Sequence, residues 1–406
     1  MIITDVTCTV LVVPNCNANA CDSAQDTILV EVHTDDGITG IGETDANPWV
    51  IKAIIEAPGS HIMSLGLKEL VVGQNPTEPG ALWDRLYKFT AMTGRRGAGI
   101  CAAGALDMAV WDLYGKATGR PVWQLLGGAQ KEFVTPYASL LPSGTTLEDY
   151  RRSLLEKARW ARDLGFRAAK MEICIKGPYA HNLLREGDDA IVELVGLCRE
   201  AVGPEMTMMV DVAYAWSDWK EALRVMRRIE PFDIFFMETP LPSDDLEGYA
   251  RLANATSIRI AAGEWLTTRF EFAELMDRGN IDVAQPDIGR VGGITEAMRV
   301  AQMAQDRGKL IVPHCWKTGI GAAATAHFAA ATSNCLFIEF LPPSVAESAL
   351  RRDLVQEELQ IADGKLDLPR RPGLGIELNA EAVLRFAKGA EDYAEVRQGL
   401  SAPQLS

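Results

Sequence analysis

The fold is decided by residues 208–264, where three short apolar runs each end in an acid: Met208-Met209-Val210-Asp211, Phe235-Phe236-Met237-Glu238 and Ala261-Ala262-Gly263-Glu264. The acids are 27 and 26 residues apart, about the length of one strand–helix–strand repeat. Short apolar runs of this kind are typical of strands buried in a parallel sheet, and the segments between them have helical periodicity. The pattern predicts three successive barrel strands whose terminal carboxylates point into one mouth.

These three acids, Asp211, Glu238 and Glu264, are candidate metal ligands. Converging carboxylate oxygens, with no Cys or His pair to compete, suit Mg²⁺, which prefers hard oxygen ligands. A single strand-end acid can equally cap a helix or pair with a basic residue. Because three of them recur at a regular repeat, we favour one Mg²⁺ per active site.

The strand–helix alternation continues on both sides of this stretch. Further strands are expected at residues 134–139, 167–172, 281–287, 309–314 and 336–339. Eight strands alternating with helices are the pattern of a (β/α) barrel that closes on itself. The predicted catalytic domain covers residues 128–340.

The segments outside the barrel predict a second, α+β unit. In residues 1–127, β-forming runs at 2–14 and 27–42 precede a mainly helical stretch. Two polar segments there, residues 15–23 and 43–49, are expected to be loops. The C-terminal segment, residues 341–406, is too short to fold alone, so we expect it to pack back on the N-terminal unit.

The composition is that of an ordinary soluble globular protein. The net charge of −15 argues against nucleic-acid and anionic-membrane partners, because like charges repel. The eight cysteines are scattered and match no zinc motif, which favours reduced thiols and a cytoplasmic protein. The N-terminus has no basic region followed by an apolar core, and no apolar run reaches about 18 residues. We therefore expect neither a signal peptide nor a membrane span.

His314 is the candidate general acid or base. It follows a predicted strand 27 residues after Asp287, so the two side chains should meet at neighbouring strand ends. The carboxylate would fix the imidazole tautomer and raise its basicity. A lone His is more often a satisfied structural residue, but its place beside a metal site and a partner acid favours catalysis here.

Three further charged residues are expected on the same rim. Lys170 could neutralise substrate charge or, with a lowered pKa, move a proton. Glu172 lies two residues on and faces the same way, either as a functional group or as a rim acid paired with a lysine. Glu339 could donate a proton or a hydrogen bond to an oxyanion if it stays protonated, which crowding favours because neighbouring carboxylates raise one another's pKa.

Tryptophans 216, 265 and 316 lie just beyond site residues and would wall the pocket, with core packing as the alternative for each. A divalent ion on a substrate carboxylate acidifies the neighbouring C–H by stabilising the enediolate. A base then removes that proton. An acid either returns it on the other face, which gives racemisation, or helps to expel a β-hydroxyl, which gives dehydration.

With these residues assembled, the chain resembles the enolase superfamily, specifically its mandelate racemase subgroup. The resemblance covers nearly the whole length and includes a signature-like helix, Ala102-Ala103-Gly104-Ala105-Leu106-Asp107-Met108-Ala109-Val110-Trp111-Asp112-Leu113-Tyr114-Gly115-Lys116. It implies a (β/α)₇β barrel under an α+β capping domain built from both termini, in a homo-oligomer, often a dimer or octamer.

The resemblance also implies roles. Asp211, Glu238 and Glu264 match the Mg²⁺ ligands, Asp287 and His314 the Asp–His dyad, and Glu339 the acid that holds the substrate carboxylate. Residues 15–23 and 44–49 match the loops that close over substrate. Substrate contacts are accordingly expected from Cys16, Asn47, Trp265 and Trp316.

Two departures from the family pattern bear on the reaction. The subgroup's strand-two motif is Lys-x-Lys, whereas Lys170-Met171-Glu172 keeps only the first lysine. Loss of the second base favours dehydration over racemisation, as in rhamnonate-dehydratase-like relatives, although Glu172 as a base keeps epimerisation open. Ala213 stands where some sugar-acid dehydratases carry a catalytic His, which disfavours galactonate- and mannonate-type mechanisms.

The predicted function is therefore an Mg²⁺-dependent lyase that dehydrates an aldonate-type sugar acid to its 2-keto-3-deoxy product. A racemase or epimerase of a 2-hydroxy or amino acid is the first alternative. A non-catalytic enolase-like scaffold is the alternative of another class, and retention of both the dyad and the three ligands argues against it. A metal-dependent aldolase would leave the Asp287–His314 pair unexplained.

Overall fold

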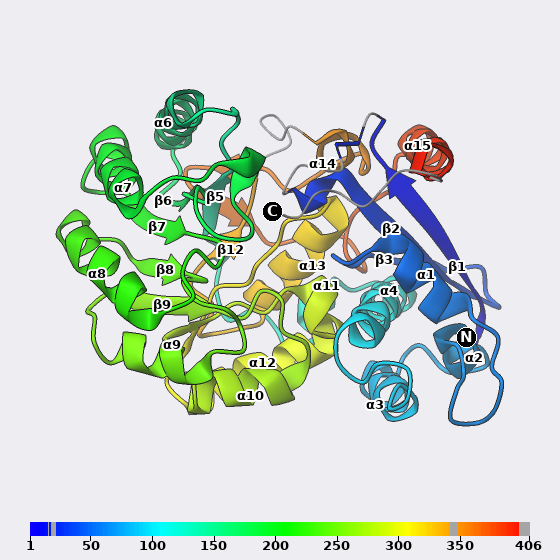
Figure 1. Cartoon of the computed structure of the whole chain (residues 1–406). Coiled ribbons are helices and arrows are strands. Elements are labelled where there is room, and N and C mark those ends of the chain that lie inside the picture. The colour runs from blue at the N-terminus through cyan, green and yellow to red at the C-terminus, as the bar shows by residue number, and fades with distance from the viewer. Residues whose placement is uncertain (15, 18–21, 342–347, 398–406) are drawn as a thin grey trace.

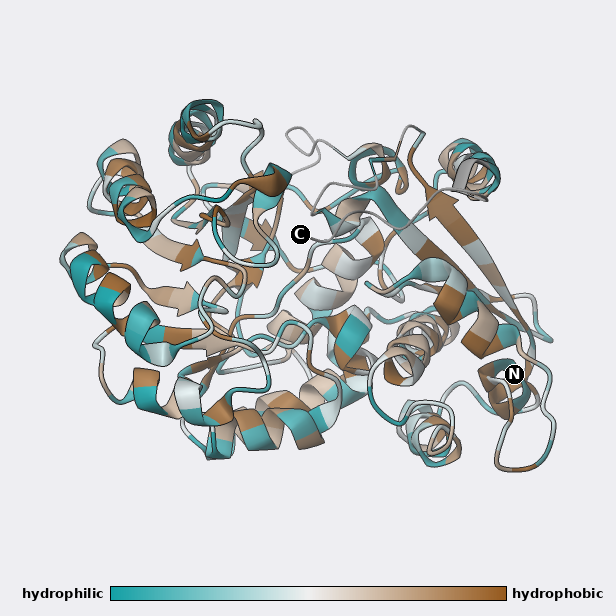
Figure 2. Ribbon diagram, in the orientation of Figure 1, coloured by the Kyte–Doolittle hydropathy of each residue, from teal (hydrophilic) through white to brown (hydrophobic). Residues whose placement is uncertain are grey.

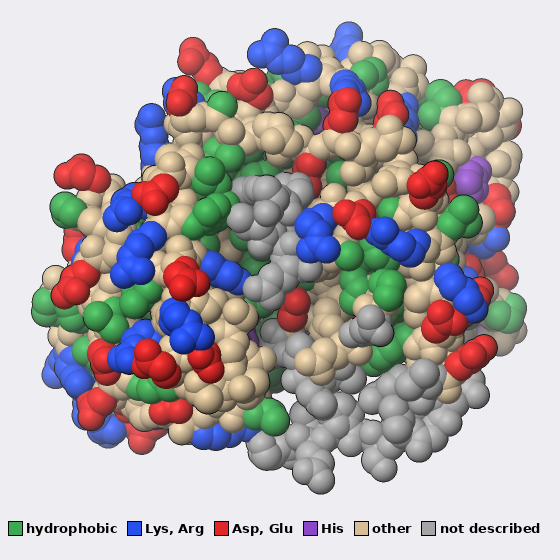
Figure 3. All heavy atoms as spheres, turned by 90° about the horizontal axis from the view of Figure 1, so that it is seen from above, with side chains coloured by type: hydrophobic (Ala, Val, Ile, Leu, Met, Phe, Trp, Pro, Cys, Tyr) green, Lys and Arg blue, Asp and Glu red, His purple; other side chains and the backbone are tan. Residues whose placement is uncertain are grey.

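The computed structural model describes residues 1–14, 16–17, 22–341 and 348–397. A ring of strands with surrounding helices stands beside a second unit of antiparallel strands and helices (Figure 1). On the face shown in Figure 3, acidic and basic side chains are interspersed, so the net charge of −15 forms no single patch there. Within the described residues, no helix combines the length and apolarity that crossing a bilayer would require.

Eight parallel strands form the barrel, in the order β11-β10-β9-β8-β7-β6-β5-β12. Their bounds are β5 Pro136–Leu140, β6 Ala168–Glu172, β7 Thr207–Asp211, β8 Phe236–Glu238, β9 Arg259–Ala262, β10 Val283–Ala284, β11 Leu310–Ile311 and β12 Ile338–Glu339. The ring closes just before β12, because Ile311 N–H donates to the Asn334 carbonyl (3.0 Å) and Leu336 N–H donates to the Ile311 carbonyl (3.2 Å). The predicted barrel is confirmed.

Strands β9, β10 and β11 end earlier than the sequence indicates. Glu264, Asp287 and His314 therefore lie two or three residues past the sheet, in the loops that follow it. At Gly263 the backbone turns with φ +119°, and a β-carbon there would lie 2.6 Å from the Phe272 ring. The chain leaves the ladder at these points and carries polar side chains over the mouth.

Helices cover the outside of the barrel, with their apolar faces toward the sheet (Figure 2). Their bounds are α6 Leu147–Asp163, η2 His181–Leu183, α7 Asp188–Val202, α8 Trp219–Ile229, η3 Glu230–Phe232, α9 Leu246–Ala253, α10 Thr268–Asp277, α11 Ile288–Val291, α12 Gly293–Asp306 and α13 Gly319–Ala330. Helix α8 illustrates why they form. The Asp218 side chain caps it by accepting from Lys220 N–H (3.1 Å), and its buried residues recur at helical spacing.

The second unit contains an antiparallel sheet in the order β1-β2-β3. Its elements are β1 Ile3–Val12, η1 Ser23–Gln25, β2 Asp26–Thr34, β3 Thr39–Gly42, α1 Pro48–Glu56, α2 Leu67–Val71, α3 Pro79–Phe89, α4 Ala98–Thr118 and α5 Val122–Leu125. The C-terminal elements are α14 Ala349–Asp353, β13 Ile361–Ala362, β14 Lys365–Asp367 and α15 Ala380–Arg397. Helix α15 packs on β1, whereas β13 and β14 join β4 (Phe133–Val134) in a small sheet.

Helix α4 packs against both units and contacts α12 of the barrel. A β-carbon at Gly104 would lie 2.9 Å from the Gly293 backbone nitrogen, so the two backbones approach where side chains are absent. Thr295 donates its N–H (2.9 Å) and its hydroxyl (2.6 Å) to Asp107. The Trp111 indole in turn donates to the Thr295 hydroxyl (2.8 Å).

Asp107 should make stability depend on pH. Burial raises the pKa of this carboxyl from 3.8 to about 7, although the Thr295 hydrogen bonds oppose the rise. The folded protein therefore retains a proton that the unfolded chain releases, and this contribution to stability is lost as pH rises through about 7. The measurement is the free energy of unfolding in urea. The value for Asp107→Asn minus the value for wild type should be roughly 2–3 kcal/mol more positive at pH 8 than at pH 5. A pH-independent difference would contradict the assignment.

Candidate active site

The barrel mouth gathers charged side chains from the ends of four strands. Lys170 and Glu172 are alternate residues of β6, and Glu172 is paired in register with Asp211 of β7. Glu238 ends β8 and Glu339 ends β12. All five side chains are buried. Buried charges need partners, so the contacts among them decide which groups are ionised.

The Lys170 ammonium lies at the centre of this group. Its Nζ is 2.9 Å from Glu238 Oε1, 3.0 Å from Glu339 Oε1, 3.6 Å from Glu172 Oε1 and 3.7 Å from Asp211 Oδ2. Burial alone would lower the pKa of Lys170, but Glu238 and Glu339 outweigh it and hold the pKa well above its usual range. The prediction that Lys170 could have a lowered pKa and move a proton is therefore wrong. It stays a cation.

His314 and Asp287 meet in the loops beyond β11 and β10. His314 Nδ1 is 2.7 Å from Asp287 Oδ2, and two backbone N–H groups of α11 donate to the other Asp287 oxygen (2.8 and 3.1 Å). On the far side of the ring, Nε2 is 3.4 Å from Glu264 Oε2. Burial opposes protonation, but the charge of Glu339 and the hydrogen bond to Asp287 raise the pKa of His314 to about 10. The ring is an imidazolium at neutral pH.

The mouth holds more carboxyl groups than cationic groups. Its carboxyl groups are those of Glu172, Asp211, Glu238, Glu264, Asp287 and Glu339. The cations that contact them are Lys170 and His314. Burial raises the pKa of Glu238 and of Glu264, and the charge of Asp211 raises both further. A divalent cation that prefers oxygen would offset this surplus, so the residues present fit Mg²⁺.

The structure does not bring the three expected Mg²⁺ ligands into one tight group. Among the described residues, two sets of three have ligand atoms within 4.8 Å of one another, Glu172–Cys174–His181 and Asp45–Asp287–His314. Asp211, Glu238 and Glu264 do not form such a set. Their assignment as Mg²⁺ ligands stays a prediction, supported by their donor chemistry and by the uncompensated charge.

Ser139 of β5 bridges two carboxyl groups. Its Oγ is 3.0 Å from Glu172 Oε1 and 2.6 Å from Glu339 Oε1. One hydroxyl proton serves one acceptor, so one of the two carboxyl groups must carry a proton of its own. Burial raises the pKa of Glu172 to about 8. Glu172 is thus the member that retains a proton at neutral pH, and the shorter contact of the Ser139 hydroxyl is its donation to Glu339.

The expectation that Glu339 stays protonated is wrong. Burial would raise its pKa, but the Lys170 ammonium and the His314 imidazolium lower it below the ordinary value. The backbone N–H of Cys315 also donates to Glu339 Oε2 (2.7 Å). Burial, reinforced by the charges of Asp211 and Glu339, raises the pKa of Glu172 instead, because Lys170 and Ser139 compensate it only in part.

The residues predicted to contact substrate do not all line one cavity. Trp316 lines a cavity of about 320 Å³, and its indole donates to Asp22 Oδ1 (2.9 Å). Trp265 and Trp216 line another cavity of about 670 Å³, in which Trp265 stacks on Tyr214 with ring centroids 4.4 Å apart.

Asn47 and Cys16 line neither of these cavities. The Asn47 side chain caps α1, and Cys16 packs against a small apolar cluster with Trp49 and Tyr393. Of the loop at residues 15–23, positions 15 and 18–21 lie outside the described residues. The assignment of Asn47 and Cys16 as substrate contacts stays a prediction.

Several residues at the mouth were missed by sequence reasoning. Gln285 donates to Glu238 Oε2 (2.6 Å), and its position two before Asp287 could have indicated an inward side chain. Asp45 crosses from the capping unit to form ion pairs with Arg290 and with Lys317, whose Nζ is 3.1 Å away. No local pattern indicates this contact, because Asp45 and Arg290 are 245 residues apart.

With this geometry established, similarity to known proteins can be interpreted. Residues 2–127 match the family described as mandelate racemase / muconate lactonizing enzyme, N-terminal domain, and residues 153–383 match the enolase C-terminal domain-like family. The chain belongs to the mandelate racemase/muconate lactonizing enzyme family of the enolase superfamily. The resemblance seen in the sequence is confirmed.

Named members of the family that resemble this chain catalyse different reactions. Arabinonate dehydratase from Saccharolobus solfataricus is 33% identical over 350 residues, 86% of this chain and 87% of that protein. D-galactarolactone cycloisomerase from Agrobacterium fabrum is 30% identical over 364 residues, 88% of this chain and 90% of that protein. A racemase from Streptomyces coelicolor, solved with bound magnesium, has a TM-score of 0.79 at 26% identity and covers 95% of this chain and 99% of its own.

Proposed function

We propose that this family member is an Mg²⁺-dependent sugar-acid dehydratase. It would remove the proton next to the carboxylate of an aldonate-type substrate and eliminate the β-hydroxyl, which gives a 2-keto-3-deoxy acid. The observation that carries the proposal is the Lys170 ammonium, held 2.9 Å from Glu238 and 3.0 Å from Glu339. Lys170 stays charged, and position 172 holds a glutamate where two-base racemases of the subgroup have the second lysine. Similarity to arabinonate dehydratase supports the substrate class.

Charge in the reaction would be balanced by groups already in place. Lys170 would offset the negative charge that develops on the substrate carboxylate as the α-proton leaves. Mg²⁺, held by Asp211, Glu238 and Glu264, would supply Lewis-acid stabilisation of the enediolate. Glu339, ionised and held by Ser139 and the Cys315 N–H, would orient the groups around Lys170.

Glu172 and His314 would carry the protons. The pKa of Glu172, about 8, is close to neutral pH, and in its carboxylate form Glu172 would accept the α-proton. The His314 imidazolium would donate from Nε2 to the departing hydroxyl, which leaves as water. The proton taken up by Glu172 would then return to His314 through the Ser139 hydroxyl and Glu339. Glu339 Oε2 is 3.9 Å from His314 Nε2.

A substrate screen tests this function. The full-length protein with Mg²⁺ is incubated with four- to seven-carbon sugar acids, and 2-keto acid is detected as its semicarbazone. We expect one or a few aldonates to yield product, and we expect product formation to stop on adding a chelator and to resume with Mg²⁺. Product formation that ignores chelators would contradict the metal assignment.

The second candidate is an isomerase that uses the same enediolate, which similarity to D-galactarolactone cycloisomerase favours. The same screen in deuterated water separates the two. Deuterium in recovered substrate, or a rearranged product of unchanged mass, without keto acid would favour the isomerase. Absence of both keto acid and deuterium exchange across the whole panel would overturn both proposals.

A further inference from the structure

A second cluster of ligand-type side chains lies at the β6 end of the mouth and has no role in the proposed reaction beyond Glu172. Glu172, Cys174 and His181 are buried, and one carboxylate oxygen, the thiol sulfur and a ring nitrogen lie within 4.8 Å of one another. We propose that these three residues bind a thiophilic divalent cation of the Zn²⁺ class. Oxygen, sulfur and nitrogen ligands together suit Zn²⁺, whereas Mg²⁺ selects oxygen, so the two ions would not compete for one site.

The two Glu172 oxygens have separate partners. Oε1 is engaged by Ser139 and lies 3.6 Å from Lys170 Nζ. Oε2 faces the Cys174 thiol, with an Sγ–Oε2 distance of 3.7 Å. A cation between Oε2 and Sγ would therefore sit on the side of the carboxylate away from the lysine.

The His181 ring is held in one tautomer. Tyr150 donates its hydroxyl proton to the Glu172 carbonyl (2.7 Å), so at the 3.2 Å contact with the ring the His181 Nδ1–H must donate to the tyrosine oxygen. The lone pair is then on Nε2. A hydrogen bond from the ring nitrogen that does not face the metal is typical of histidines that bind metals.

The loop backbone brings Cys174 and His181 together. His181 N–H donates to the Cys174 carbonyl (2.7 Å), and the next two residues both have left-handed backbones, Asn182 with φ 51° and Leu183 with φ 61°. Ligand atoms around a tetrahedral Zn²⁺ are roughly 3.5 Å apart, given metal–ligand bonds of about 2.0–2.3 Å. Closure of the cluster onto an ion therefore requires shifts of about 1 Å. His181 also lines a cavity of about 510 Å³, which offers a path of entry.

Binding has a defined proton balance and a consequence. The sulfur–hydrogen bond of Cys174 and the oxygen–hydrogen bond of Glu172 break as the two bonds to the metal form, and both protons pass to the buffer. An ion on Glu172 would also withdraw this carboxylate from the proposed proton transfer. Zn²⁺ should accordingly inhibit turnover. This inhibition rests on the proposed function, whereas binding itself does not.

Cadmium tests the site without an activity assay. Cd²⁺ is titrated into the full-length protein in excess Mg²⁺, and the thiolate-to-Cd²⁺ charge-transfer absorption is followed in the ultraviolet. We expect a band that saturates at one equivalent, disappears in Cys174→Ser and persists in Cys315→Ser, a matched change of another thiol at the mouth. Tyr150→Phe, which keeps all three ligands, should weaken binding by about 10–100-fold. Near-UV circular dichroism confirms that each variant is folded.

Each other outcome overturns the proposal. A band that survives in Cys174→Ser, is lost in Cys315→Ser, or never forms at stoichiometric Cd²⁺ would exclude this site. If Cys174→Ser does not fold, His181→Gln and Glu172→Gln replace it, and unchanged Cd²⁺ affinity in both would be equally decisive. These results hold whether or not the dehydratase screen succeeds.

Discussion

Replacing His314 with alanine is expected to lower kcat of the proposed dehydration by about 10²–10⁴-fold. The residue is aimed into the mouth by the 2.7 Å contact with Asp287, and its raised pKa, about 10, makes it the proton donor for the departing hydroxyl. Loss of the ring leaves water to supply that proton. The measurement is kcat for 2-keto acid formation on the substrate that the screen identifies.

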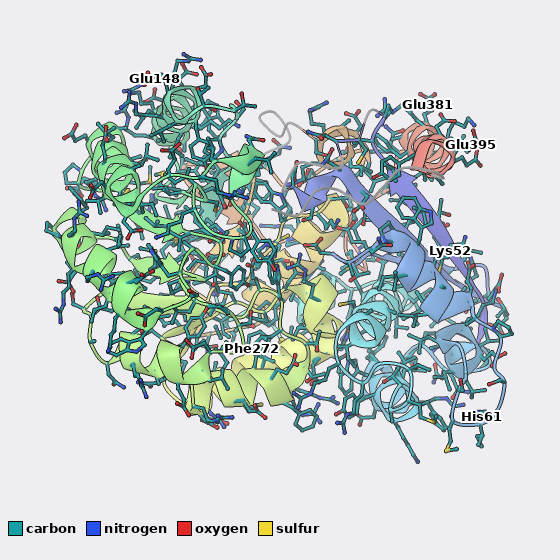
Figure 4. The ribbon with its side chains drawn as sticks, viewed as in Figure 1. Lys52, His61, Glu148, Phe272, Glu381 and Glu395 are labelled. Atoms are coloured by element: carbon teal, nitrogen blue, oxygen red, sulfur yellow. The ribbon has the colours of Figure 1, made fainter. Side chains whose placement is uncertain are left out.

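Two controls separate catalysis from damage to the site. The His314→Ala variant should still bind Mg²⁺ by calorimetry, because the expected ligands are the three carboxylates. His61→Ala, on an exposed segment of the capping unit remote from the barrel (Figure 4), should retain wild-type kcat. Full activity in the His314 variant would remove the dyad from the mechanism, and loss of Mg²⁺ binding would show that the imidazole is part of the metal site.

Replacing Lys170 with methionine is expected to destabilise the protein by about 3–5 kcal/mol at neutral pH. Methionine has a similar length, so the change removes charge rather than volume. The ammonium compensates Glu238 and Glu339, at 2.9 and 3.0 Å, and without it these buried carboxylates repel one another or must take up protons. The measurement is the free energy of unfolding from urea denaturation without Mg²⁺.

The same variant should respond to ions and to pH. Excess Mg²⁺ should restore part of the loss, about 2.7 kcal/mol at 100 times the dissociation constant, because the cation replaces the missing charge. The defect should shrink as pH falls and the carboxyl groups become protonated. Lys176→Met removes a lysine from a half-exposed pair with Asp188 (2.7 Å) and should cost no more than about 1 kcal/mol. Equal effects of the two substitutions would contradict this account of Lys170.

Much of the barrel was predictable because its pattern is local and repeated. The apolar runs that end at Asp211 and Glu238 coincide with β7 and β8, since a buried parallel strand must be apolar along its length. The end of the strand before His314 was predicted less exactly. Strand β11 ends at Ile311, because Pro313 has no N–H to extend the ladder.

Charge states were harder to predict, because they depend on how many partners each buried group receives. Crowding among carboxylates was anticipated, but its effect was assigned to Glu339 rather than to Glu172. Glu339 lies 3.0 Å from the Lys170 ammonium and 3.9 Å from the His314 ring, and it accepts a backbone N–H. Glu172 lies 3.6 Å from the same ammonium and shares the Ser139 hydroxyl with Glu339. The cations and hydrogen-bond donors around Glu339 together outweigh its burial and lower its pKa, whereas those around Glu172 do not.

The sequence by itself determined the order of strands and helices, the acids that close successive strands, and the family to which the chain belongs, because these follow from periodicities and spacings within a few tens of residues. Only the tertiary structure decided which buried acids are neutralised, that Ser139 joins Glu172 to Glu339, and that Asp45 reaches Arg290 and Lys317. Such contacts join residues as far apart in the chain as Asp45 and Lys317, 317 − 45 = 272 positions. Their electrostatic energies depend on separation and burial in space, which no local pattern of residues encodes.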